Sequence, residues 1–151
     1  MDRGYKEVIV AVVATLSNHF KYQLMDKKID LSADTLKIIL MNDTFAFDKD
    51  THATLALVTA DQLETGSGYT QNSKELANLV LAEDDSNDKG KMTCDDVRWV
   101  STGNIGPTGS AIIYDDTTDD DTVIGCIDFG TDYTITNEST LDIKNIEIDV
   151  T

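Results

Sequence analysis

Two runs of acidic residues hold the side chains best suited to bind a metal ion. One spans residues 83–88, and the other, residues 115–121, has five aspartates in seven positions. Carboxylate oxygens concentrated in a turn suit Ca²⁺. The first run departs from EF-hand spacing, because Lys89 precedes Gly90 where a ligand belongs. The alternative is a solvated loop whose aspartates stabilise turns. We favour that alternative, with no metal or cofactor, and keep calcium as the second interpretation, with the candidate ligands Asp84, Asp85, Asp88, Asp115, Asp116 and Asp119.

Nucleophilic and redox chemistry finds little support in the sequence. Cys94 and Cys126 are far apart and form no CxxC motif. We therefore expect two small hydrophobic residues in or near the core rather than a disulfide or redox pair. His19 and His52 are the only histidines, and the chain contains neither GxSxG nor a phosphate-binding glycine motif. Carboxylate pairs arise by chance among 28 acidic residues. The sequence thus predicts a protein that is not an enzyme and has no catalytic residues.

The charge excludes several classes of partner. The 28 acidic residues outweigh 12 basic ones, for a formal net charge of −16. Nucleic acid and anionic lipid are bound through Lys and Arg, so we expect neither as a partner. Residues 1–98 carry net −6, whereas residues 99–151 carry net −10, with Lys144 as their single base. An acidic face of this kind suits docking against a basic protein surface. The apolar run 8–14 is too short to cross a bilayer.

The elements that must position these residues are mainly β. Short apolar or alternating runs recur about every ten residues and are separated by Gly, Asn and Asp turns. This spacing predicts an antiparallel β-sandwich, jelly-roll-like, with one or two short helices. One helix is expected over 17–27, capped by Ser17 or Asn18, and a second at the capping box Thr59–Gln62. The length of 151 residues predicts a single domain.

Other expected strands follow from apolar runs. At two places the alternation of apolar and polar residues shifts by one residue, and each shift predicts a β-bulge, one near residues 95–96 and one near 144–145. Pro107 is expected in a turn over 106–109. The expected strands include 36–40, 55–58, 76–82, 92–94, 97–99, 111–114, 123–129, 141–143 and 146–150.

A few apolar and aromatic residues are candidates for partner binding. Phe45 and Phe47 lie in an apparent loop, where they either pack into the core or contact a partner. In the 8–14 run, which forms either an added strand or an arm exchanged with a neighbouring subunit, the candidates are Val8, Val10 and Val12. Trp99 is expected in the core. Sugar binding would need exposed aromatic rings near turns, for which the candidates are Tyr69, Tyr114 and Tyr133.

Long strings of residues also carry a family resemblance. They lie at 15–24, 29–31, 35–41, 45–54, 68–70, 83–85, 105–108, 112–118 and 124–130. Over nearly the whole chain from Thr15 onward, the sequence resembles a family of small virion structural proteins of tailed bacteriophages and prophages. The resemblance implies a structural protein without catalytic residues. Because family members often begin near Thr15, it also implies one β-sandwich domain over 15–151, preceded by an extension or arm over 1–14.

From this resemblance we infer a capsid decoration (cement) protein. Such a protein would be assembled in the reducing bacterial cytoplasm, where no disulfide is needed, and would sit on the exterior of the phage head. Its expected partners are the major capsid protein and further copies of itself, as a dimer or trimer. The alternative is a protein of the tail or fibre that binds host-surface polysaccharide.

Overall fold

A computed structural model describes residues 6–10 and 13–151, and only the backbone of Lys6, Val8 and Val10. The predicted fold class is confirmed, because the chain is mainly β with antiparallel sheets and two short helices, as in a β-sandwich. Among the described residues, no helix is long and apolar enough to cross a membrane.

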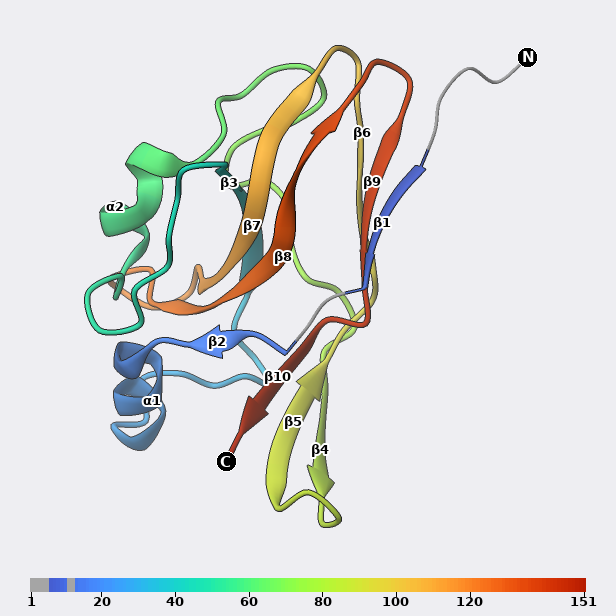
Figure 1. Cartoon of the computed structure of the whole chain (residues 1–151). Helices are drawn as coiled ribbons and strands as arrows, with labels where there is room; N and C mark the ends of the chain where they lie inside the picture. Colours follow the sequence, from blue (N-terminus) through green and yellow to red (C-terminus); the bar gives the residue numbers. More distant parts are fainter. Residues whose placement is uncertain (1–5, 11–12) are drawn as a thin grey trace.

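One layer of the fold is a four-stranded antiparallel sheet. Its strands, in spatial order, are β2 (Thr15–Leu16), β8 (Val123–Ile135), β7 (Ile105–Asp115) and β3 (Leu36–Asn42). The long β7–β8 hairpin forms the centre of this sheet (Figure 1). Gly106 and Pro107, joined by a cis peptide bond, lie inside β7 at a register shift. The expected turn at Pro107 is therefore wrong, because the irregularity is accommodated within a paired strand.

The other strands form two three-stranded sheets. The first, in spatial order, comprises β1 (Lys6–Val10), β9 (Thr140–Lys144) and β6 (Val97–Val100). The second comprises β10 (Glu147–Val150), β5 (Lys89–Thr93) and β4 (Val80–Asp84). Figure 1 shows β1, β9 and β6 beside the β7–β8 hairpin, with β4, β5 and β10 continuing below them.

The two predicted bulges are breaks between strands. Residues 94–96 separate β5 from β6, and residues 145–146 separate β9 from β10. Since β5 pairs with β10 and β6 with β9, both breaks fall at the same point of one ladder and divide it into two sheets. The slips in alternation were therefore located correctly, but the prediction of bulges is wrong. Cys94 also falls in a break rather than in its expected strand, and only residues 80–82 of the 76–82 run form one.

The first helix confirms its prediction. Helix α1 (Asn18–Met25) begins after Ser17, whose Oγ accepts a hydrogen bond from the backbone N–H of Phe20 at 3.0 Å. The second helix lies earlier than expected, because α2 (Leu55–Val58) is followed by a 3₁₀ turn over Thr59–Asp61. Thr59 ends α2 instead of capping a new helix, since its hydroxyl donates to the carbonyl of Leu55 at 2.8 Å. The expected strand at 55–58 is thus also wrong.

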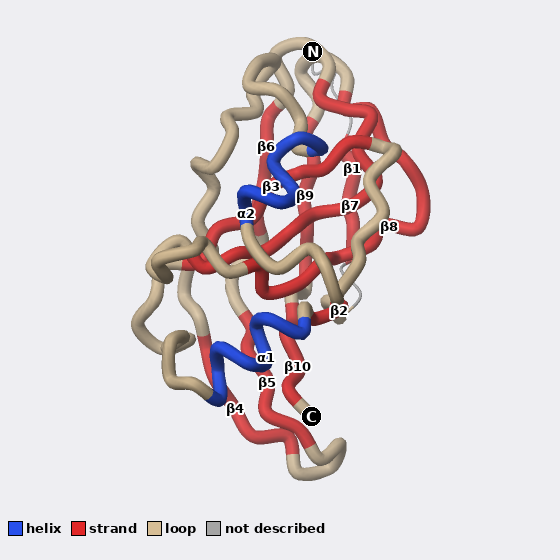
Figure 2. The backbone as a smooth tube through the Cα atoms, turned by 90° about the vertical axis from the view of Figure 1, so that its left-hand side faces the viewer, coloured by secondary structure: helices blue, strands red, loops and turns tan. Residues whose placement is uncertain are grey.

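The centre of the four-stranded sheet is buried on both faces. Alternate residues of β3 point to opposite sides, so that Ile38 and Leu40 join the main core while Ile39 and Met41 join a second apolar cluster. The main core lies between the layers and includes Trp99, as expected. The second cluster lies under α2, which Figure 2 shows in front of β3 and β7, and consists of Ile39, Met41, Val58, Ile112, Tyr114, Val123 and Cys126.

The N-terminal segment contributes a strand to its own chain. Strand β1 runs parallel to β9, with Ile9 opposite Ile143, and Ile9 is buried in the main core. Exchange of this segment between copies stays a prediction. Of the predicted contact residues, Val12 and the side chains of Val8 and Val10 lie outside the described residues.

Candidate partner-binding site

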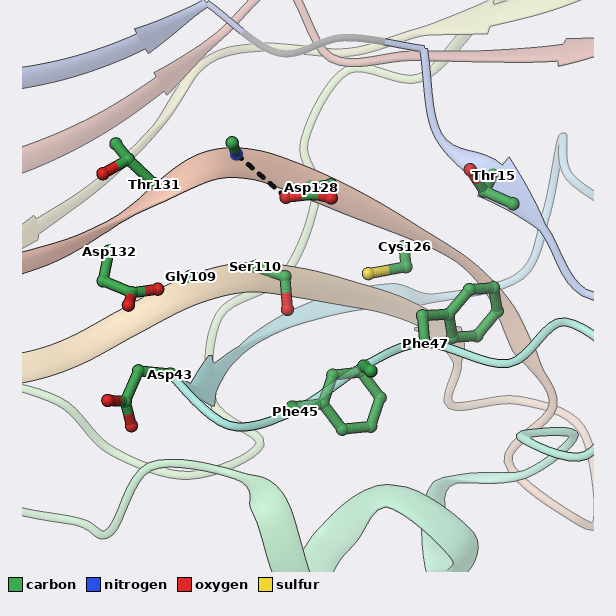
Figure 3. A pocket seen from close by; sticks show the side chains of 12 residues that line it. Thr15, Asp43, Phe45, Phe47, Gly109, Ser110, Cys126, Asp128, Thr131 and Asp132 are labelled. Carbon is green, nitrogen blue, oxygen red and sulfur yellow. Dashed lines mark hydrogen bonds between the residues drawn. The ribbon is translucent and has the colours of Figure 1, made fainter.

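A hollow of about 570 Å³ opens on the outer face of the four-stranded sheet, the face that carries the second apolar cluster. Its walls come from four parts of the chain: β2, the loop after β3, the middle of β7, and β8 (Figure 3). The lining residues are Thr15, Asp43, Phe45, Ala46, Phe47, Gly109, Ser110, Cys126, Asp128, Gly130, Thr131 and Asp132.

The loop after β3 is folded by local hydrogen bonds. At its start, Asn42 Oδ1 accepts from the backbone N–H of Thr44 at 3.1 Å and from the Thr44 hydroxyl at 2.9 Å. At its other end, the backbone N–H of Asp48 donates to His52 Nδ1 at 2.9 Å. These bonds follow from residue types that stabilise turns. They hold the segment between them across the sheet.

His52 also orders the two phenylalanines. Its ring lies 5.0 Å from that of Phe45 and 5.9 Å from that of Phe47, measured between centroids. Both phenylalanines are half-buried and pack against the second apolar cluster, yet both also line the hollow. The sequence left two alternatives for these phenylalanines, packing into the core or contact with a partner. The structure shows the packing and leaves part of each ring at the hollow, so contact with a partner stays a prediction.

The floor of the hollow joins β7 and β8. Ser110 is only 6% exposed, and its Oγ has no hydrogen-bond partner among the described residues apart from the nearby thiol of Cys126. Cys126, on the same face of the adjacent strand, offers a thiol, which is a weak partner at best. Burial raises the pKa of the Cys126 thiol to about 12, so it stays protonated and unreactive near neutral pH.

Three exposed carboxylates surround this floor. Asp43 follows β3, whereas Asp128 and Asp132 belong to β8. Asp128 Oδ1 accepts a hydrogen bond from the backbone N–H of Gly130 at 2.8 Å. A Cβ on Gly109 would lie 2.5 Å from Asp132 Oδ1, so this glycine makes room for that carboxylate. Since none of the twelve lining residues is cationic, the hollow favours positive charge.

The two acidic runs lie elsewhere and apart from each other. One forms the turn between β4 and β5, and the other connects β7 to β8 (Figure 1). Asp84 accepts from the Asn87 side chain at 2.9 Å, and Asp116 pairs with Lys37 at 3.2 Å. The described residues include no group of three or more His, Cys, Asp and Glu arranged to hold a metal ion. Asp85, Asp88 and Asp119 are exposed turn residues.

Asp115 differs from the other acidic candidates because it is completely buried. Its Oδ1 accepts a hydrogen bond from the backbone N–H of Thr117 at 2.9 Å. Burial, together with the nearby carboxyl of Asp34, raises the pKa of Asp115 to about 7. In the sequence, Asp115 directly follows the apolar run 111–114. This position at the end of an expected strand was the available signal that Asp115 could be buried.

The remaining candidates lie mostly in structural positions. Cys94 and Cys126 are free thiols, half-buried and buried respectively, as expected for small apolar residues. Tyr69 and Tyr114 are buried, so the suggestion that they form a sugar-binding platform is wrong. Tyr133 is half-buried and meets the ring of Phe129 edge-on.

Sequence reasoning missed most of the residues around the hollow. Of the lining residues, only Phe45 and Phe47 were predicted to bind a partner. Asp43, Ser110, Asp128 and Asp132 lack a shared motif, and their proximity depends on the pairing of β7 with β8. The one available signal was alternation along 123–129, which places Cys126 and Asp128 on the same face.

No protein-family model matches this chain, and searches of the curated proteins and of the solved structures found no similar protein.

Proposed function

We propose that this chain is a virion structural protein of a tailed bacteriophage that binds the outer surface of the capsid as a decoration protein. The observation that carries the proposal is the hollow, in which half-buried phenylalanines and exposed carboxylates lie together on one face of a sheet. The 45–54 string of the family resemblance supplies both phenylalanines. The 124–130 string supplies part of the floor and one wall.

The charge of the molecule supports an exterior position. With a net charge of −16, the protein would be repelled by packed DNA inside the head. The capsid surface that it contacts should be comparatively basic. Charge complementarity of this kind speeds association and selects the partner. A rigid β fold suits a protein that must clamp neighbouring capsid subunits without changing shape.

The experiment is to purify virions, disrupt them stepwise into heads and tails, and quantify this chain in each fraction. We expect the chain in the head fraction, at a copy number comparable to that of the major capsid protein. A few copies per particle in the tail fraction would overturn the proposal in favour of the alternative, a tail or fibre protein that binds host polysaccharide. Absence from both fractions would exclude both functions.

A second experiment tests the surface itself. Shells assembled without this protein are mixed with the purified chain, and bound protein is measured after sedimentation. We expect Phe45→Ala combined with Phe47→Ala to reduce shell binding strongly. The matched control replaces two exposed apolar residues outside the hollow, Tyr22→Ala and Leu57→Ala, and should bind like the unmodified chain. Equal binding by both variants would show that the hollow is not the contact surface.

A further inference from the structure

We propose that the hollow between the Phe45–Phe47 segment and the β7–β8 hairpin is a receptor site for an arginine side chain of the partner protein. This inference deepens the proposed function and rests on it only for the identity of the partner. The site itself is argued from three independent features: the carboxylates, the aromatic rings and an unpartnered buried hydroxyl.

The carboxylates select a cation. Asp43, Asp128 and Asp132 lie around one opening, with no lining Lys or Arg to neutralise them. Figure 3 shows Asp43 and Asp132 at one end of the hollow, on either side of Gly109. A guanidinium group offers five N–H donors in a planar fork that matches carboxylate oxygens, and such charge-assisted hydrogen bonds are stronger than neutral ones.

The aromatic rings select arginine over lysine. Phe45 and Phe47 extend the hollow away from Asp43 (Figure 3). Each ring also contacts the ring of His52. A planar guanidinium stacks on an aromatic face, whereas the lysine ammonium is a compact and strongly hydrated charge. The methylene groups of an arginine side chain would in addition cover the exposed parts of the phenylalanine rings.

The hydroxyl of Ser110 points to a missing partner. It belongs to a residue that is only 6% exposed, it lies on the floor of the hollow, and apart from the weak thiol of Cys126 it has no hydrogen-bond partner within the described part of the chain. Figure 3 shows its oxygen directed toward the side where Phe45 lies. A buried polar atom without a partner costs free energy, which an incoming N–H donor would recover.

Among the described residues, a second copy of this chain offers no arginine free to enter the hollow. The chain has two arginines, of which Arg3 lies outside the described residues. The other, Arg98, forms a bidentate pair with the buried Asp142, with donor–acceptor distances of 2.6 and 2.8 Å. With Arg98 engaged in this pair, we assign the site to the partner of the proposed function, a different protein that presents arginine on its surface.

The test is a titration of the full-length, ¹⁵N-labelled chain with a blocked glycyl-arginyl-glycine tripeptide, followed by NMR. We expect the amide signals of Gly109, Ser110 and Gly130 to shift in a saturable manner. The same peptide with citrulline, which has the shape of arginine without its charge, should bind at least about tenfold more weakly, and the lysine peptide should also bind more weakly. Signals that stay unchanged, or equal binding of the citrulline peptide, would overturn the proposal.

Variants make the test specific to this site. Asp43→Asn combined with Asp132→Asn should weaken arginine-peptide binding by about tenfold or more. The control, Asp85→Asn combined with Asp88→Asn, removes the same charge from the exposed β4–β5 turn and should leave binding unchanged. Equal losses in both variants would mean that net charge alone attracts the peptide. Because the titration needs no virions, failure of the site and failure of the capsid role are separate results.

Discussion

Asn145 donates its backbone N–H to Oδ1 of Asp96 over 3.3 Å, across the point where two paired strands are both interrupted. This contact joins the β5–β6 break to the β9–β10 break. Asn145 also adopts a left-handed backbone conformation, with φ of 58°. The second layer of the fold therefore changes direction at one defined place, between the sheet of β1, β9 and β6 and the sheet of β10, β5 and β4.

The first prediction concerns the left-handed backbone conformation of Asn145. Replacement by valine should destabilise the fold by about 1–2 kcal/mol, because a β-branched residue is disfavoured at positive φ. Replacement by glycine should cost much less, since glycine accepts this conformation freely. Urea unfolding of both variants measures the difference. Equal stability of the valine and glycine variants would contradict the left-handed conformation at residue 145.

Tyr69 is predicted to stabilise the main core through its hydroxyl. That oxygen accepts from the backbone N–H of Leu40 at 3.1 Å and donates to Gln62 Oε1 at 2.7 Å. The change Tyr69→Phe leaves both groups without this partner and should lower the free energy of unfolding by about 1–3 kcal/mol. Tyr133→Phe is the control and should have little effect. A Tyr69→Phe variant as stable as the unmodified chain would show that the network does not form.

Asp115 predicts a pH dependence of stability. Its pKa in the folded state is about 7, above the ordinary value of 3.8, so the folded state holds a proton that the unfolded state releases between these values. The free energy of unfolding should therefore fall as the pH rises from about 4 toward 7 and change little above that range. The slope from this group is at most about 1.4 kcal/mol per pH unit.

Asp115→Asn isolates this effect. The asparagine retains an acceptor for the Thr117 N–H, carries no charge and should be more stable than the unmodified chain at pH 8. Chemical unfolding of both proteins at several pH values gives the comparison. If the difference between them does not grow between pH 5 and pH 8, the pKa of Asp115 is not raised.

Gly109 offers a way to disturb the hollow with little damage to the fold. In Gly109→Ala the new Cβ would lie 2.5 Å from Asp132 Oδ1, the mobile end of an exposed side chain. We expect the Asp132 carboxylate to move, arginine-peptide binding to weaken, and the unfolding midpoint to change little. Gly90→Ala is the matched control, because nothing lies within 4 Å of its added Cβ. Unchanged peptide binding in Gly109→Ala would argue against a role for Asp132.

The thiols are predicted to react slowly in the native protein. Burial raises the pKa of Cys94 to about 11, with a further contribution from Asp95 and Asp96, and that of Cys126 to about 12. A thiol-specific reagent at pH 8 should therefore label Cys94 slowly and Cys126 more slowly still, since only the thiolate reacts. Both should react rapidly in denaturant. Rapid labelling of Cys126 in the folded chain would mean that this part of β8 opens readily.

Local patterns in the sequence determined the fold class and several elements. Alternating apolar residues indicated β3, β6 and β8, and Ser17 indicated the start of α1, because these signals depend on neighbours within a few positions. The slips of alternation near 95–96 and 144–145 were also visible. Whether each slip was a bulge or a break between strands could not be predicted, since the sequence of a single strand does not reveal whether its partner is interrupted at the same place.

Tertiary structure alone decided the hollow and the environment of Asp115. Asp43, Ser110 and Asp132 come together through the pairing of β3, β7 and β8, and that register depends on how apolar faces are buried across the whole sheet. The parallel position of β1 beside β9 likewise follows from contacts between the two ends of the chain. A linear pattern records which residues prefer burial, but long-range packing chooses which of them meet.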